Sequence, residues 1–360
     1  MMEKMNGLSL DFIIHPGETV KEVLDERGMS QEELAIRTGF SPKHVSEVVN
    51  GKKGISPAFA KTLEYVFGMP ASFWINLQGI YDREIIEFQE QQGITENEFS
   101  ILRKLKDVIK YCQELRIMSH DNNKEAQIME LRNILMVNKL EYIAKLPINQ
   151  VAFRGSKNID VDIYVLYAWQ RICELYADSV EIEHDYDVNE LIKVIPKIKE
   201  AMFLEVNDMI KELQKIFSSV GIAFQVVKNF PGAPVQGFIK KKNNKVILCM
   251  TIRQSFADIF WFTLFHEIGH LINDNVSNQY IDYTFTDSEH ERRADDYARE
   301  TLINEDQYQI FISQDSINEK SIEEFAKSQG VRDFIVVGRL ENDKSDYKLF
   351  ANKRLRYKWK

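Results

Sequence analysis

The stretch WFTLFHEIGHLIND, residues 261–274, constrains the fold of this chain more than any other. Its apolar residues suit a buried helix, yet His266, Glu267 and His270 stand among them. Histidines four residues apart lie one turn apart on one face of a helix, so both imidazoles can reach one metal ion. Glu267 would lie beside that ion and could take a proton from water. The pattern predicts a metal site on a buried helix; the alternative is a hydrogen-bonded histidine pair.

A third metal ligand is expected from the segment SEHERRADDYARETLI, residues 288–303. Glu291 and Asp295 are one helical turn apart, so Glu291 can bind metal while Asp295 accepts a hydrogen bond from a ligating histidine. Glu289 and His290 are alternatives, and we prefer Glu291 because His290 would face about 100° away from it on a helix. Three protein ligands leave the fourth position of a tetrahedral zinc ion open to water.

Together, HEIGH and the following ExxAD resemble the ImmA/IrrE family of zinc-dependent metallopeptidases. The segments AFRGSKNIDVDIYVLYAWQRICE, FPGAPVQGFI and GVRDFIVVGRL share this resemblance, which extends over residues 147–342. It implies a zincin-like domain in which His266, His270 and Glu291 bind Zn²⁺ and Glu267 is the general base.

The segments that flank the two motifs predict a small β-sheet and buried helices. YVLYAWQRICELYA, residues 164–177, is expected as a buried helix. In residues 235–250 the pair Asn243-Asn244 is a plausible hairpin turn, because asparagine tolerates positive φ. The edge of this hairpin could pair with an extended peptide. FIVVGRL, residues 334–340, is expected as a further strand.

Other side chains near the predicted site leave their roles open. Cys249 ends the strand before the metal helix and is expected to fill the core. The alternative is a thiolate that closes the fourth zinc position, since sulfur binds zinc readily. Arg253, Tyr280, Tyr283 and Tyr297 are candidates for stabilising an oxyanion, and the sequence does not choose among them.

A second motif is SQEELAIRTGFSPKHVSEVVNGKKGIS, residues 30–56, which predicts two short helices and a turn. Ser30 can cap the first helix and form a capping box with Glu33. Gly39 supplies the turn, and Ser41 can cap the second helix, whose buried face is formed by valines. In a helix-turn-helix the second helix enters the major groove of DNA. The alternative is a small helical bundle without this role.

This region resembles the Xre-type repressor fold found in HigA-type antitoxins, over about seventy residues that end in the FW-NLQ--YD segment. The resemblance implies operator DNA and a cognate toxin or repressor protein as partners, and a homodimer. It implies phosphate contacts by Gln31. The second helix would place side chains against bases and backbone: Lys43, His44, Glu47, Asn50 and Lys52. Pro42 replaces a glutamine that many phage-type repressors carry, so their base code cannot be copied.

Charge limits how this region could bind DNA. The whole chain has a net charge of -9, which opposes general coating of nucleic acid. Residues 41–61 are locally basic, with four lysines against Glu47 alone. So few phosphate contacts per subunit favour a dimer for tight binding.

The domain organisation follows from these motifs and from the length of 360 residues. We expect a mainly α protein with a small β-sheet (α+β). Residues 1–90 form a helix-turn-helix domain of five helices, residues 91–146 a helical linker or dimerisation region, and residues 147–360 the metallopeptidase domain.

The cysteines and the hydropathy pattern indicate the compartment. The three cysteines are far apart in the sequence, as expected for reduced thiols in the cytoplasm. No apolar run is long enough to span a membrane, and the N-terminus does not resemble a signal peptide. We therefore expect a cytoplasmic protein without a membrane partner.

Three functions fit the sequence. The first is a DNA-binding regulator, an antitoxin of a toxin–antitoxin module, whose zinc metalloendopeptidase domain cleaves a protein partner or itself. The second keeps the same fold but makes the peptidase-like domain a silent sensor or toxin-binding module. The third is a metabolic metallohydrolase with an incidental helical appendage.

Overall fold

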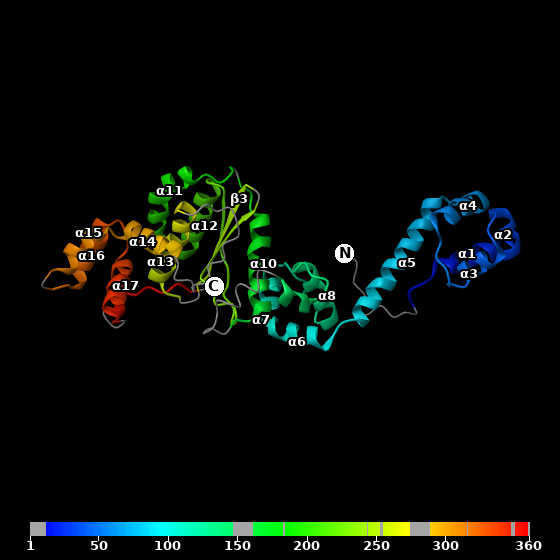
Figure 1. Cartoon of the computed structure of the whole chain (residues 1–360), viewed down its shortest axis with the longest axis horizontal. Helices are drawn as coiled ribbons and strands as arrows, with labels where there is room; N and C mark the ends of the chain where they lie inside the picture. Colours follow the sequence, from blue (N-terminus) through cyan, green and yellow to red (C-terminus); the bar gives the residue numbers. More distant parts are fainter. Residues whose placement is uncertain are drawn as a thin grey trace. The chain divides into compact units, whose positions relative to one another are not determined.

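The structure, a computed structural model, describes residues 12–146, 161–273 and 289–358, except 183, 243, 253–254, 315 and 347–349. The chain divides into two compact units (Figure 1). The first comprises Met1–Phe99 and Asp121–Met129, and the second comprises Ser100–His120 and Glu130–Lys360. The boundaries expected at residues 90 and 146 remain predictions.

The protein is mainly helical with one small sheet, as the sequence predicts. The helices and strands of the described residues are α1 (Pro16–Arg27), α2 (Gln31–Thr38), α3 (Pro42–Val49), α4 (Pro57–Phe67), α5 (Ala71–Gln92), α6 (Glu96–Lys104), α7 (Lys106–Glu114), α8 (Lys124–Ile134), η2 (Leu140–Lys145), α10 (Ile163–Ser179), α11 (Val188–Glu200), η3 (Ala201–Phe203), α12 (Val206–Ser218), β1 (Ile222–Val226), β2 (Gly237–Lys242), β3 (Lys245–Met250), α13 (Ala257–Asn273), α14 (Glu289–Leu302), α15 (Glu305–Ile312), α16 (Glu319–Ser328), α17 (Asp333–Lys344) and η4 (Ala351–Lys353).

Helices α1–α5 belong to the first unit and pack around one apolar core. Serines at the N-caps of α2, α3 and α4 each accept a hydrogen bond from the backbone N–H of the third helical residue. Such caps satisfy donors that the helix itself leaves unpaired. Ser30 caps α2 as expected, but the predicted capping box is wrong. The Glu33 carboxylate instead accepts hydrogen bonds from Arg37, one turn further along.

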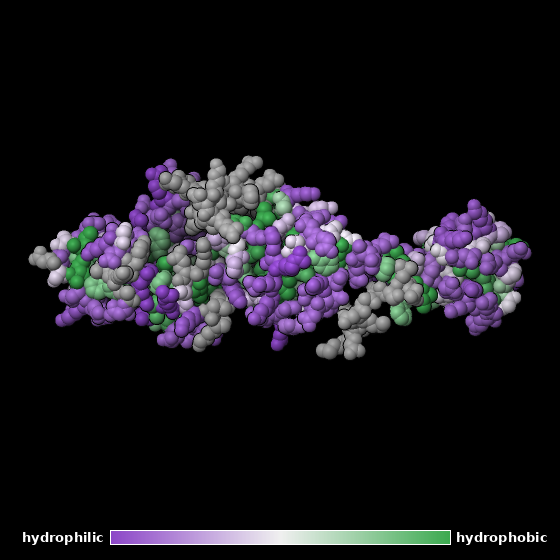
Figure 2. Space-filling view, turned by 90° about the horizontal axis from the view of Figure 1, so that it is seen from below, coloured by the Kyte–Doolittle hydropathy of each residue, from purple (hydrophilic) through white to green (hydrophobic). Residues whose placement is uncertain are grey.

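Helix α5 leaves most of its surface uncovered by the described residues. Of its 22 residues only Trp74 is buried. Large apolar side chains on it are exposed, among them Phe73, Ile75, Ile80 and Ile86. Hydrophobic side chains also reach the surface along α5 in Figure 2, beside a mostly hydrophilic helical bundle. A soluble helix with so much exposed apolar area suggests a contact surface.

The second unit is built on a three-stranded sheet in the order β1-β3-β2. β1 and β3 are parallel, whereas β2 and β3 form the expected hairpin, in which Lys242 pairs with Lys245. Alternation along the strands gives the sheet two faces. Phe224, Ile239 and Leu248 lie on the face that joins the main core with α11, α12 and α13 (Figure 1).

The other face of the sheet is covered by α10, the helix predicted to be buried. Trp169 of α10 packs edge-on against Phe238 of β2. Cys249 pairs in register with Phe238 and contacts Cys173 of α10, so its thiol belongs to this face. The metal helix α13 packs with the opposite face, which favours the core-filling role for Cys249.

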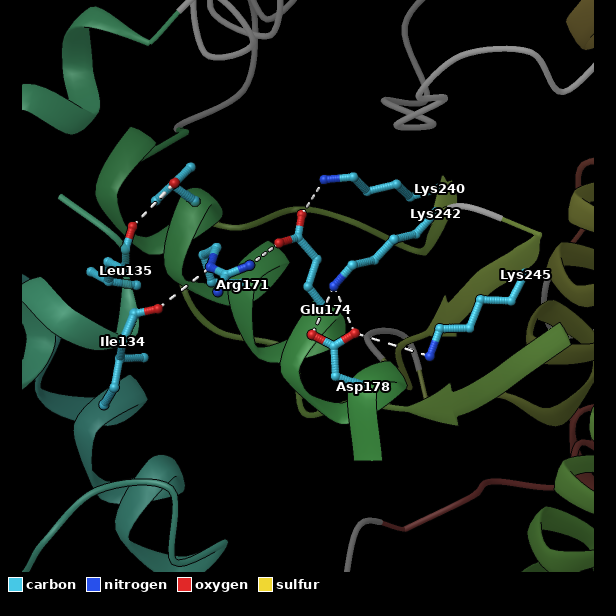
Figure 3. A network of polar contacts seen from close by, with 9 residues as sticks. Ile134, Leu135, Arg171, Glu174, Asp178, Lys240, Lys242 and Lys245 are labelled. Atoms are coloured by element: carbon cyan, nitrogen blue, oxygen red, sulfur yellow. Dashed lines mark hydrogen bonds and ion pairs between the residues drawn. The ribbon is translucent and has the colours of Figure 1, made fainter. Parts of the chain in front are cut away.

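Charged side chains fasten α10 to the β2–β3 hairpin (Figure 3). Glu174 lies between Arg171 of the same helix and Lys240 of β2. Asp178 accepts from Lys242 at 2.6 Å and lies 4.0 Å from Lys245. Two carboxylates of one helix therefore pair with three lysines of the hairpin.

The prediction that FIVVGRL forms a strand is wrong, because these residues belong to helix α17. Phe334, Ile335, Val336 and Val337 are all buried there. A short run of β-branched residues suits a fully buried helix as well as a buried strand, and periodicity alone does not separate the two. No helix among the described residues is both long and apolar enough to cross a membrane.

Candidate nucleic-acid interface and metal centre

Helices α2 and α3 form the predicted helix-turn-helix. Gly39 ends α2 in the left-handed conformation, with φ of 72°, which glycine adopts without strain. Ser41 caps α3 by accepting from the His44 N–H, and Pro42 occupies the first helical position. Val45, Val48 and Val49 are buried, so the opposite face of α3 is available to a partner.

The residues expected to touch DNA lie mainly on that available face. Lys43 is largely exposed, and its ammonium lies 3.8 Å from the Glu47 carboxylate. The Asn50 amide donates to the Ser46 carbonyl at 2.7 Å at the end of α3. Lys52 is exposed just beyond that end. Gln31 is half-buried at the start of α2. The structure thus places these residues along α3 and its neighbouring helix ends.

His44 differs from the expectation, because its ring does not point freely away from the core. The ring packs between Phe40 and Phe59, with centroid distances of 4.6 and 5.0 Å. Its Nε2 atom is buried without a hydrogen-bond partner among the described residues. Burial, together with the charge of Lys53, lowers the pKa of His44. His44 therefore braces α3 against the α2–α3 turn and α4, and only part of it faces outward.

In the second unit, α13 and α14 bring the three predicted metal ligands together. The Nε2 atoms of His266 and His270 are 3.1 Å apart. They lie 3.2 Å and 3.4 Å from the two carboxylate oxygens of Glu291. The helices approach closely at Gly269, where a Cβ atom would lie 3.0 Å from the Cα of Ala294.

This donor set fits a tetrahedral zinc ion. Bonds of about 2.0–2.1 Å to nitrogen and oxygen require donors roughly 3.3 Å apart, and the three observed separations bracket that value. Asp295 lies 2.8 Å from Nδ1 of His266. A proton on Nδ1, donated to this carboxylate, leaves the lone pair of Nε2 directed at the cluster.

The electrostatics of Glu291 agree with its place in the cluster. Burial by itself would raise the pKa of its carboxyl, yet hydrogen bonds with His266 and His270 hold the pKa at about 2. The rival ligands lie elsewhere: Glu289 is exposed, and Nδ1 of His290 is 2.9 Å from Arg293. Of the three candidates, Glu291 alone meets both histidines among the described residues.

Glu267, the predicted general base, is fully buried on α13. Its carboxylate lies against Gly237, the first residue of edge strand β2. A Cβ atom on that glycine would lie only 1.7 Å from Oε1 of Glu267. Gly237 is not among the residues predicted from the sequence, although a glycine that opens a strand signals a close approach.

The candidates for oxyanion stabilisation are mostly untested. Arg253, Tyr280 and Tyr283 lie outside the described residues. Tyr297 is described, and its ring lies 3.2 Å from the Cβ position of Gly269. It therefore helps to pack α14 on α13, and burial raises the pKa of its hydroxyl.

Comparisons with known proteins match the N-terminal part of the chain. Residues 20–74 match the helix-turn-helix family model. Virulence-associated protein I of Dichelobacter nodosus is 38% identical over 82 residues, which are 22% of this chain and 75% of that protein. An uncharacterized HTH-type transcriptional regulator of Escherichia coli, YddM, is 33% identical over 66 residues, which are 18% of this chain and 70% of that protein.

Among solved structures, the antitoxin HigA of Pseudomonas aeruginosa with the higBA promoter is 36% identical, covering 20% of this chain and 80% of that one, with a TM-score of 0.20. The family match over residues 20–74 contains α2, α3 and α4, and therefore includes the capped α2–turn–α3 pair. Through this N-terminal region, the chain belongs to the helix-turn-helix family of transcriptional regulators.

Proposed function

We propose that the protein is an antitoxin-type transcriptional regulator that binds operator DNA as a homodimer and carries a zinc-dependent peptidase centre. The single observation behind the DNA-binding half is the capped α2–turn–α3 pair, which lies within residues 20–74 that match the helix-turn-helix family. The observation behind the peptidase half is the convergence of His266, His270 and Glu291.

For DNA binding, α3 would lie in the major groove, with its first turn towards the base edges. Lys43 and Glu47 would meet bases, and the exposed Lys52 would meet a phosphate. The positive charge is small, so one copy would make few phosphate contacts. A homodimer supplies a second copy of α3, and the exposed apolar residues of α5 offer a surface for that contact.

The DNA-binding half is tested by fluorescence anisotropy with DNA from upstream of the protein's own gene, over a range of salt concentrations. We expect binding that is selective over scrambled DNA. Lys52→Ala should weaken it and reduce the salt slope by about 1 per site. Lys21→Ala, an exposed lysine on α1, is the matched control. Equal affinity for scrambled DNA would contradict the proposal.

For the peptidase half, His266, His270 and Glu291 would hold the zinc, and Asp295 would keep the His266 ring in place. When bound, zinc supplies Lewis acidity for the hydrolysis of a peptide bond. A Glu267 carboxylate oxygen would accept the proton of the attacking water and pass it to the leaving amine. The edge strand β2, which begins beside Glu267, could orient an extended peptide by backbone hydrogen bonds.

Metal content and cleavage test this half. We expect purified protein to contain one zinc per chain, and His270→Ala to lose it. Glu267→Gln should keep the zinc and abolish cleavage of the protein itself or of a protein encoded beside it. Glu289→Gln, a change at an exposed carboxylate of α14, is the control. Absence of zinc from protein purified without chelators contradicts the proposal.

The burial of Glu267 favours a second candidate, a sensor or toxin-binding domain without turnover. Its side chain is 0% exposed beneath Gly237, whereas a general base must reach water. In this case Glu267→Gln would leave regulation by the protein unchanged. A regulator that loses its response with Glu267→Gln, while zinc and DNA binding persist, supports the peptidase.

A further inference from the structure

A cavity of about 680 Å³ lies in the second unit, between α13, α14 and α17. Phe262 and Thr263 line it one turn before His266 on α13, and Asp295 and Arg299 line it one and two turns after Glu291 on α14. No metal ligand lines it. Its volume is within the usual range for small-molecule sites, about 300–1,000 Å³. The cavity is therefore separate from the proposed metal cluster, but Asp295 both lines the cavity and contacts His266 of the cluster.

One wall of the cavity is apolar. Six large apolar side chains, from the three helices and the residues beside them, form it: Phe256, Ile259, Phe262, Leu302, Ile303 and Ile335. Such a wall contacts the hydrocarbon part of a ligand and excludes water from it.

The charged side chains of the cavity are evenly divided between arginine and aspartate, and most already have partners. Arg339 pairs with Glu305 and donates to a backbone carbonyl. Arg354 donates to Asp258 at 3.0 Å. The guanidinium of Arg299, by contrast, has no hydrogen bond or ion pair with any described residue. It is the one arginine of the lining whose guanidinium remains open to a ligand.

Carboxylate oxygens also remain open in this lining. Asp295 uses Oδ1 for His266, and its Oδ2 has no partner among the described residues. The Oδ1 atom of Asp258 is buried and has no hydrogen-bond partner among the described residues. The cavity thus offers one free cation and free anionic oxygens beside an apolar wall. A ligand that matches all three features carries both charges and a hydrocarbon group.

We propose that this cavity binds a free α-amino acid with an apolar side chain. Its carboxylate would pair with Arg299, its ammonium group with Asp295, and its side chain would lie on the apolar wall. Asp295 and Arg299 are four residues apart on α14, so their side chains emerge about 5–6 Å apart on one face. The ammonium and carboxylate groups of an α-amino acid are adjacent, so the ligand can contact Asp295 and Arg299 at the same time.

Binding in the cavity would act on the metal site through Asp295. An ammonium group at Oδ2 draws negative charge away from Oδ1, which weakens the acceptor for Nδ1–H of His266. A histidine with a weaker acceptor is a less basic metal ligand. Amino acid and zinc would therefore lower each other's affinity by the same factor. This coupling rests on the zinc centre proposed above, whereas binding in the cavity does not.

The binding step is tested by calorimetry on the full chain after metal removal, with L-phenylalanine, L-phenylalaninamide and N-acetyl-L-phenylalanine. We expect saturable binding of L-phenylalanine, and at least tenfold weaker binding of the two derivatives, each of which lacks one charge. Arg299→Gln should weaken L-phenylalanine binding at least tenfold. Arg292→Gln, at an exposed arginine of α14 outside the cavity, should leave it unchanged.

Two results would overturn the assignment: no saturable binding of L-phenylalanine, L-leucine or L-methionine, or equal binding of L-phenylalanine and its two derivatives. The coupling is tested by zinc affinity against a competing chelator, with and without saturating L-phenylalanine. We expect at least threefold weaker zinc binding with the amino acid, and equal affinity would refute the coupling. If the protein binds L-phenylalanine but no zinc, the proposed amino-acid site is supported and the proposed zinc centre is contradicted.

Discussion

At the scale of single residues, the geometry of the proposed metal cluster depends on the Asp295 carboxylate, which orients the His266 imidazole. Asp295 accepts from Nδ1 of His266 at 2.8 Å and so directs Nε2 at Glu291. Asp295→Asn keeps the shape of the side chain but removes its charge. We expect zinc affinity to fall about 10–100-fold, measured by chelator competition. Asp296→Asn, at the exposed neighbouring residue, should change it little. Equal losses in both variants would contradict the role of Asp295.

Two glycines should respond to alanine with opposite signs. Gly237→Ala would place a Cβ atom 1.7 Å from the Glu267 carboxylate. The displaced carboxylate and strand should cost on the order of 1–3 kcal/mol of stability. Gly79 lies inside α5 with no described atom within 4 Å of its Cβ position. There Gly79→Ala should raise the free energy of unfolding by roughly 0.5–1 kcal/mol, because alanine favours the helix. Denaturant unfolding followed by circular dichroism measures both, and a stabilising Gly237→Ala would rule out the close contact.

At the scale of elements, the attachment of α10 to the hairpin depends more on Glu174 than on Asp178 (Figure 3). The Glu174 side chain is 10% exposed and forms ion pairs with two cations, Arg171 and Lys240. Glu174→Gln leaves both cations with a neutral partner and should cost about 3 kcal/mol. The Asp178 side chain is 43% exposed, so Asp178→Asn should cost less than about 1 kcal/mol. Urea unfolding measures both losses of stability. Similar losses for Glu174→Gln and Asp178→Asn would show that the difference in burial does not decide how much each carboxylate contributes.

Elements whose ends carry a local chemical signal could be predicted from the sequence. Ser41 and Gly39 mark the turn of the helix-turn-helix, because capping and positive φ are decided by neighbouring residues. The helical spacing of Glu291 and Asp295 likewise predicted which carboxylates would meet the histidines. Tertiary packing decided the rest. The FIVVGRL run lies in helix α17, and the ring of His44 packs against Phe59 of α4; the local periodicity encodes neither outcome.

At the scale of the whole molecule, the proposed regulator needs two copies of α3, because one copy carries little positive charge. Helix α5 exposes apolar residues that the described part of the chain does not cover. Ile80→Glu would place a charge on this surface and should turn a dimer into a monomer, as measured by light scattering after size-exclusion chromatography. Operator affinity should fall at least tenfold, since one half-site then binds alone.

The matched control is Ile310→Glu, because Ile310 is an exposed isoleucine on α15, in the second unit. It changes charge and hydropathy in the same way as Ile80→Glu, but on another helix. If both variants remain dimers with full operator affinity, the dimer contact lies elsewhere than α5. If the wild-type protein is a monomer that still binds one operator tightly, the few lysines around α3 suffice for tight binding. Dimerisation is then not required for operator binding.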